Sequence, residues 1–203
     1  MTNFLSPTLR VDICAACVID RSDMARDTVE IGESFSGVRL FARAADRDER
    51  GAFRRVYSRE EYARLGLTDE FVEDNVSTSK SGVLRGLHYD FRLAKFVQVL
   101  EGEIFDVVLD IRRESKTFGK WKSFRMSAEG CEQLYVPRGF AHGFYVISNI
   151  AVVSYKQTSA YDPASEGQVL WCDPEIGIDW PLTGAPILSV KDAQAKPLSL
   201  LPE

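Results

Sequence analysis

Residues 75–110, NVSTSKSGVLRGLHYDFRLAKFVQVLEGEIFDVVLD, carry the clearest structural pattern in the chain. One apolar run precedes Gly102 and a second follows it, and both alternate with the two-residue period of a β-strand. Glycine supplies the positive φ that a tight turn needs, so we expect a hairpin that turns at Glu101-Gly102. His88, one of two histidines, and Lys95 stand near the head of this hairpin. The stretch predicts a rigid hairpin beside a candidate site, although a surface histidine near a solvated lysine fits equally well.

The same β pattern dominates most of the chain. Gly, Pro, Asn and Asp turn signals separate short candidate strands at residues 38–41, 71–76, 121–126, 133–136, 143–147, 151–156 and 169–171. Many short strands without alternating helices are typical of a sandwich or a barrel. We therefore predict an all-β fold of the jelly-roll type.

The sequence also predicts the domain organisation and one helix. Ser58, with Glu61 three residues later, resembles the capping box of a short helix that ends near Gly66. Residues 1–35 give mixed signals and are interpreted as an N-terminal arm. Residues 36–203 are predicted to form a single jelly-roll domain that ends in an irregular C-terminal tail, because no repeat or linker indicates a second domain.

Composition argues against several classes of protein. The 203 residues carry a formal net charge of -5, whereas a nucleic-acid-binding protein normally presents a basic face. The chain lacks an apolar run of about 18 residues and a secretory signal pattern, so we expect no membrane span and a cytoplasmic location. The four cysteines suit reduced thiols. Cys14-Ala-Ala-Cys17 has the spacing of half a zinc site or a redox pair, but accident is the favoured interpretation because no second pair accompanies it.

Five motifs in order along the chain resemble those of the dTDP-4-dehydrorhamnose 3,5-epimerase family. They are GVLRGLHYD at 82–90, EGEIFDVVLDIRRESKTFGKW at 101–121, SAEGCEQLYVPRGFAHGF at 127–144, SYKQTSAYDP at 154–163, and IGIDWPL at 176–182 with LSVKD at 188–192. The resemblance implies a homodimer of cupin-type jelly rolls that needs no cofactor and no metal. It also implies an epimerase that inverts C3, C5 or both of a nucleotide-linked 4-keto-6-deoxy sugar, and it leaves open which of these carbons react.

The resemblance assigns catalytic roles to four residues, and the chemistry explains their types. A carbon beside a ketone is inverted by removing its proton, holding the enolate and returning a proton to the other face. His88 matches the base, since imidazole has the unperturbed pKa closest to working pH, and Asp192 matches its carboxylate partner. Lys95 matches the cation that faces the C4 oxygen. Tyr155 matches the general acid, although from the pattern alone Tyr155 would be a packed strand residue and Asp192 a solvated one.

The resemblance also implies a substrate-binding set. Arg85 and Arg50 match cationic contacts to the diphosphate, which suits a guanidinium fork, and in the family the equivalent of Arg50 comes from the partner subunit. Tyr161 matches an aromatic residue that stacks on the nucleotide, and His142 matches a histidine of the substrate pocket. Further family contact positions are Asn75, Glu166 and Lys191. A core histidine, a turn residue and two solvated charges remain open alternatives.

Four departures from the family pattern concern the nucleotide. The loop before Lys95 is shorter, Asp90 replaces a glutamine, and Glu73 replaces another glutamine. The family segment Arg-Gly-Phe-Phe-Phe-Glu is RGAFRR at 50–55, which keeps Phe53 as a contact but replaces an acid that grips thymine by Arg55. An arginine fork matches the O6 and N7 acceptors of guanine, and the carboxylate of Glu73 could accept from guanine N1–H and its amino group. The changes at Arg55 and Glu73 favour a GDP-linked 4-keto sugar over a dTDP-linked one, and both stay candidates. The shorter loop and its Gly-Leu-His-x-Asp character also resemble relatives that epimerise GDP-linked 4-keto-heptoses.

Three competing functions remain. A metal-dependent cupin oxygenase needs two or three histidines and a carboxylate around the ion, and His88 and His142 are the only histidines in the chain. A non-catalytic sugar-binding relative would keep the pocket but lose the base or the acid, whereas both are present. A 3,4-ketoisomerase shares the fold and the substrate type, although the motifs resemble the epimerases more closely.

Overall fold

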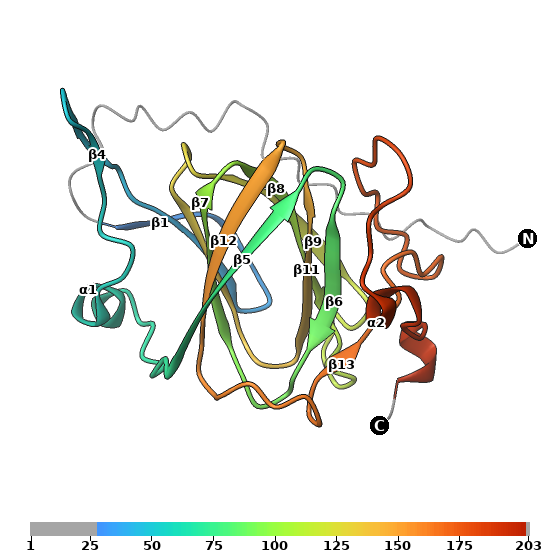
Figure 1. Cartoon of the computed structure of the whole chain (residues 1–203). Coiled ribbons are helices and arrows are strands. Elements are labelled where there is room, and N and C mark those ends of the chain that lie inside the picture. Colours follow the sequence, from blue (N-terminus) through green and yellow to red (C-terminus); the bar gives the residue numbers. More distant parts are fainter. Residues whose placement is uncertain (1–27, 202–203) are drawn as a thin grey trace, which may run out of the picture.

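The computed structural model describes residues 28–201 as two facing β-sheets and two short helices (Figure 1). The larger sheet contains, in spatial order, β1 (Val29–Phe35), β2 (Val38–Ala42), β10 (Glu132–Val136), β7 (Lys95–Glu101), β12 (Ile150–Gln157) and β5 (Glu73–Lys80). The smaller sheet contains β13 (Gly167–Gln168), β6 (Leu84–Tyr89), β11 (Phe140–Val146), β8 (Glu103–Asp110) and β9 (Trp121–Ser127). Neighbouring strands are antiparallel, and the all-β jelly-roll prediction is confirmed.

The prediction of a hairpin at Gly102 is wrong in one respect. Both strands form, but β7 lies in the six-stranded sheet and β8 in the five-stranded sheet, so the turn carries the chain across the sandwich. Gly102 has φ +78°, and a Cβ there would lie 2.0 Å from the carbonyl oxygen of Ile150. A corner between sheets therefore needs the same small, left-handed residue as a hairpin, and the local sequence does not distinguish the two.

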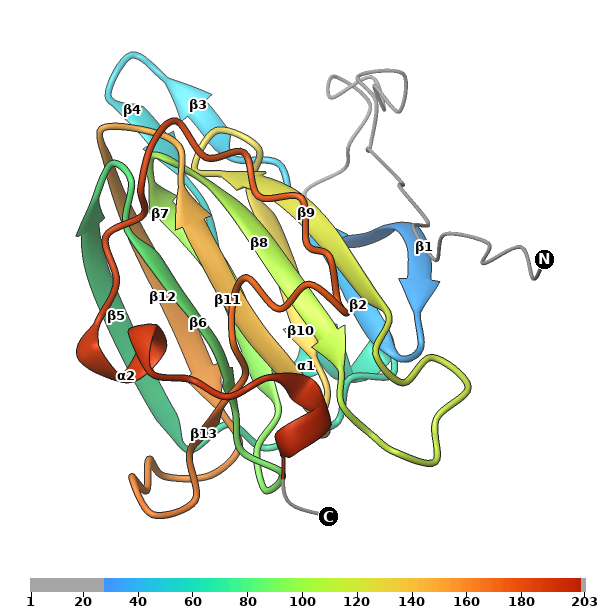
Figure 2. The same ribbon diagram turned by 90° about the vertical axis from the view of Figure 1, so that its right-hand side faces the viewer.

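The C-terminal tail covers the outer face of the five-stranded sheet (Figure 2). On β8, Ile104 and Val108 face the core between the sheets, whereas Val107 and Leu109 pack in a second apolar cluster with Trp180 and other tail residues. Burial on both faces explains why β8 is more apolar than a strand with one wet face. The tail also brings the short helix α2 (Val190–Ala193) against β6.

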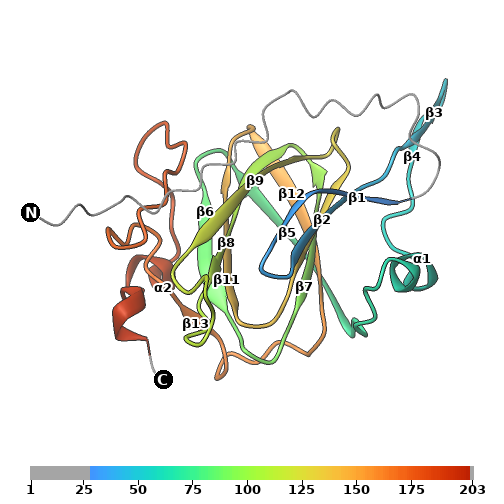
Figure 3. The same ribbon diagram turned by 180° about the vertical axis from the view of Figure 1, so that it is seen from behind.

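Three details refine the predicted organisation. β1 lies within the predicted N-terminal arm and is a strand paired with β2 (Figure 3). The charged segment at residues 46–53 forms a small hairpin of β3 (Asp46–Asp48) and β4 (Gly51–Phe53). The helix α1 (Arg59–Arg64) forms where expected, and the Ser58 hydroxyl accepts a hydrogen bond from the Glu61 amide.

Two further expectations concern the cysteine pair and membrane-spanning segments. Cys14 and Cys17 lie outside the described residues. Among the helices that the structure does describe, none is long and apolar enough to cross a membrane.

Candidate active site

A cavity of about 530 Å³ opens between the two sheets. Strands of both sheets contribute side chains to it, so it has two walls that face each other. The wall from the five-stranded sheet is lined by Arg85 and His88 of β6 and by His142, Gly143 and Phe144 of β11. The other wall and the rim are lined by Glu73, Asn75 and Ser77 of β5, Lys95 of β7, Tyr155 and Gln157 of β12, and Tyr161 and Glu166.

Each histidine of the cavity is paired with a carboxylate. His88 and His142 are direct partners across the β6–β11 ladder, so their side chains share one face of the sheet. The Nε2 of His88 lies 2.5 Å from Oδ1 of Asp192, and the Nε2 of His142 lies 2.8 Å from Oδ2 of Asp106. The wall thus holds two imidazole–carboxylate pairs side by side.

Asp192 is positioned by the helix that carries it. Ser189 caps α2, its hydroxyl donates to Oδ2 of Asp192 at 2.8 Å, and it accepts from the Asp192 amide at 3.1 Å. Burial raises the pKa of the Asp192 carboxyl, but the hydrogen bonds from His88 and Ser189 outweigh burial and leave the pKa below its usual value. The carboxylate is therefore ionised at neutral pH, and its bond to Nε2 leaves Nδ1 of His88 as the nitrogen that can accept a proton.

The opposite wall presents an amine and a phenol. Lys95 and Tyr155 point inward from neighbouring strands of the six-stranded sheet. Burial lowers the pKa of the Lys95 ammonium, although Glu166, Asp106 and Asp90 act in the other direction. Burial raises the pKa of the Tyr155 phenol, and Arg85 partly offsets this rise. Tyr155 is therefore a protonated acid at neutral pH.

The two walls together can carry out inversion at a carbon. A base on one wall and an acid on the other reach opposite faces of a ring bound between them. The ammonium of Lys95 supplies a positive charge near an oxyanion, which is usually a large catalytic contribution in a water-poor site. The geometry thus supports proton removal on one face and proton delivery on the other.

A polar network closes the rim of the cavity. Glu73 accepts from the side-chain amide of Asn75 at 2.7 Å and from the backbone N–H of Tyr161 at 3.1 Å, so each carboxylate oxygen has a partner. The Tyr161 hydroxyl donates to Glu166 at 3.4 Å, and Lys191 lies 3.5 Å from the same carboxylate. The ring of Tyr161 is about half exposed, which leaves a face for a planar ligand.

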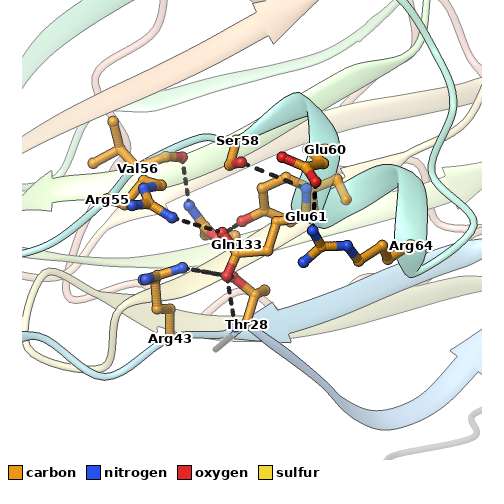
Figure 4. Close-up of polar contacts among 10 residues, drawn as sticks. Thr28, Arg43, Arg55, Val56, Ser58, Glu60, Glu61, Arg64 and Gln133 are labelled. Carbon is orange, nitrogen blue, oxygen red and sulfur yellow. Dashed lines mark hydrogen bonds and ion pairs between the residues drawn. The ribbon is translucent and has the colours of Figure 1, made fainter. Parts of the chain in front are cut away.

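Four of the expected binding residues lie away from this cavity. Arg50 and Phe53 belong to the β3–β4 hairpin, which projects from the sandwich, and Phe53 is 71% exposed. Arg55 lies 3.5 Å from Glu61 of α1, in a cluster that also holds Arg43 and Thr28 (Figure 4). Asp90 is a buried residue of the loop between β6 and β7, outside the lining of the cavity, and it accepts hydrogen bonds from Arg92.

Sequence reasoning missed three groups in or beside the cavity. Ser77, Gln157 and the carboxylate of Asp106 each keep a buried oxygen without a hydrogen-bond partner among the described residues. Strand alternation was the available signal, because Gln157 follows Tyr155 by two residues and must share its face. No group of three or more His, Cys, Asp or Glu side chains within residues 28–201 could hold a metal ion.

Comparisons with known proteins agree with these motifs. Residues 33–199 match the family model described as dTDP-4-dehydrorhamnose 3,5-epimerase. The dTDP-4-dehydrorhamnose 3,5-epimerase of Salmonella typhimurium is 49% identical over 152 residues, which cover 73% of this chain and 83% of that protein. A Pseudomonas aeruginosa protein of the same name is also 49% identical, over 73% of this chain and 84% of its own.

The solved structures point the same way. The dTDP-6-deoxy-D-glucose-3,5-epimerase of Legionella pneumophila, in complex with dTDP-4-keto-L-rhamnose, superposes with a TM-score of 0.83 at 44% identity, over 86% of this chain and 95% of that one. A 3'-monoepimerase of Streptomyces bikiniensis, in complex with dTDP-quinovose, gives a TM-score of 0.76 at 32% identity, over 80% and 84% of the two chains. The chain therefore belongs to the dTDP-4-dehydrorhamnose 3,5-epimerase family.

Proposed function

We propose that this protein is a cofactor-independent epimerase that inverts C3, C5 or both of a dTDP-linked 4-keto-6-deoxy sugar. The observation that carries the proposal is the placement of His88 and Tyr155 on facing walls of one cavity. The solved relative from Legionella pneumophila holds dTDP-4-keto-L-rhamnose, which is a substrate of this chemical type. A binding protein without catalysis needs no base and acid on opposite walls, and the relatives named above are all epimerases.

The proposed reaction proceeds through an enolate. Nδ1 of His88 takes the proton from the carbon beside the ketone, and the electron pair of the broken C–H bond moves onto the C4 oxygen. Asp192 holds the imidazole and stabilises the imidazolium that forms. The ammonium of Lys95 stabilises the negative oxygen. The phenol of Tyr155 then gives a proton to the opposite face of the same carbon, and solvent later restores the charge of both groups.

The nucleotide part of the substrate lies at the rim in this proposal. Arg85 contacts the diphosphate, and the Tyr161 ring stacks on the base. A dTDP-linked sugar is preferred to a GDP-linked one. Both oxygens of Glu73 are already hydrogen-bonded within the chain, and the solved relatives from Legionella pneumophila and Streptomyces bikiniensis hold dTDP-linked sugars.

The active form is proposed to be a homodimer in the cytoplasm. The β3–β4 hairpin contributes no residue to the lining of its own cavity, and it carries Arg50, whose side chain is 86% exposed. A partner subunit that receives this hairpin would obtain the second arginine for the diphosphate. The described cysteines, Cys131 and Cys172, are free thiols, in keeping with a reducing compartment.

Complementation tests the shared site. Arg50→Ala and His88→Asn are each expected to be nearly inactive alone. Mixed after dissociation, they should recover activity, because one site of each mixed dimer then has both native residues. No recovery, in mixtures shown to contain mixed dimers, would place Arg50 outside the partner's site.

Deuterium incorporation tests the reaction itself. The purified protein is incubated in D₂O with dTDP-4-keto-6-deoxyglucose, and NMR follows the ring carbons. Deuterium should enter at C3, at C5 or at both, with inversion. No exchange would indicate a binding protein, and a carbonyl that moves from C4 to C3 would indicate a ketoisomerase.

A further inference from the structure

Gln157 is the one buried glutamine in the six-stranded sheet whose Oε1 has no partner among the described residues. It is 5% exposed and lines the cavity. The other two buried glutamines of this sheet, Gln98 and Gln133, bond to each other at 3.0 Å. A buried amide oxygen without a partner is unfavourable, and a ligand in the cavity can supply the missing hydrogen bond.

The strand register places Gln157 beside the residue proposed to face the C4 oxygen. Gln157 is the direct cross-strand partner of Lys95 on one side and of Glu73 on the other. Side chains at such positions share a face and start about 5 Å apart. The row Lys95–Gln157–Glu73 therefore runs from the reacting centre to the rim where Glu73 holds Tyr161.

The chemistry of the sugar decides which group Gln157 meets. Of the two carbons that flank the C4 ketone, C3 carries a hydroxyl, whereas C5 carries a methyl group and the ring oxygen. An amide can both donate to and accept from a hydroxyl, and it gains little from a methyl group. We propose that Gln157 is a positioning residue that hydrogen-bonds the C3 hydroxyl, orienting C3 for proton exchange while Lys95 holds the C4 oxygen. This inference rests on the proposed function and goes beyond it by assigning one residue to one of the two carbons.

The test measures deuterium incorporation at each carbon in Gln157→Leu. Leucine keeps the size of the side chain and removes its polar atoms. Incorporation at C3 is expected to fall roughly tenfold, which corresponds to about 1.4 kcal/mol. Incorporation at C5, where the wild type shows it, and the affinity for free dTDP should stay within about twofold.

Two further variants test whether a change in packing explains the result. Gln98→Leu is the matched control, because Gln98 is equally buried in the same sheet but lies outside the cavity; it should lower the melting temperature and leave the distribution of deuterium unchanged. Gln157→Met must repeat the result of Gln157→Leu if packing is not the cause. Unchanged C3 incorporation, or equal losses at C3 and C5, would overturn the assignment of Gln157. A wild type without any exchange would instead overturn the proposed function, which separates the two failures.

Discussion

The two walls of the cavity treat their polar groups in opposite ways. On the five-stranded sheet, His88 and His142 are each bonded to a carboxylate. On the six-stranded sheet, the side chains of Lys95, Tyr155 and Gln157 face the same cavity without such partners among the described residues. The two histidines of the first wall have their partners before a ligand arrives, whereas these three side chains of the second wall can take theirs from the ligand.

This difference matches the demands of the two half-reactions. A base must already have the correct tautomer and orientation when the C–H bond breaks, and a fixed carboxylate provides both. An acid and an oxyanion-stabilising cation act best when no other protein group already binds them. Their interaction with the substrate is then strong, because the site contains little water. Two histidines on the first wall are paired with carboxylates, whereas the proposed reaction uses one base.

The largest expected effect separates these two histidines. His88→Asn should lower deuterium incorporation at every ring carbon by about 10²- to 10⁴-fold, the usual contribution of a general base. His142→Asn should retain much more exchange. Its partner Asp106 lies in the five-stranded sheet and keeps one oxygen unpaired, whereas both oxygens of Asp192, the partner of His88, are hydrogen-bonded. NMR in D₂O measures both variants, and circular dichroism checks that they are folded. Exchange at the wild-type rate in His88→Asn would remove this residue from the role of base.

The second prediction separates proton removal on one wall from proton delivery on the other. Tyr155→Phe leaves His88 and Asp192 in place, so proton removal and return on one face should continue. Delivery to the other face should fall by roughly two orders of magnitude, a typical contribution of a positioned acid. The expected product is deuterated substrate of unchanged configuration. Equal losses of exchange and inversion would show that the acid and the base are not separate groups.

The walls also differ in how far the sequence could predict them. His88, Lys95 and Tyr155, which the motifs singled out, line one cavity. The alternation of side chains along a strand and the order of the family motifs can both be read from the sequence. The pairing of Asp106 with His142 needed the β8–β11 register, which no local pattern contains. The crossing at Gly102 was missed because a hairpin and an inter-sheet corner use the same turn residue. Arg55 lies beside Glu61 of α1 and not in the cavity of its own subunit, because a motif position carries no information on which subunit or neighbour the side chain meets.

The third prediction concerns the alkaline limb of activity. Burial lowers the pKa of Lys95, whereas it raises the pKa of Tyr155. These opposite directions favour Lys95 as the group that titrates on this limb, and kcat/KM of the free enzyme should fall about tenfold per pH unit above its pKa. Lys95→Met should have a lower plateau without this limb. A limb that persists in Lys95→Met and disappears in Tyr155→Phe would assign it to the phenol.

The smallest expected effect concerns the nucleotide at the rim. Glu73 accepts from two donors, the Asn75 side chain and the Tyr161 backbone N–H. A glutamine at this position has one oxygen and one NH₂ group, so Glu73→Gln should lose one of these bonds and loosen the loop that carries Tyr161. We expect dTDP to bind about tenfold more tightly than GDP, a difference of about 1.4 kcal/mol, and Glu73→Gln to weaken both nucleotides by a similar few-fold factor. Competition binding measures all four values, and Asp74→Asn, a change at an exposed neighbour that pairs with Lys156, serves as the control. If Glu73 instead read the guanine base, the wild type would prefer GDP and the variant would lose affinity for GDP alone.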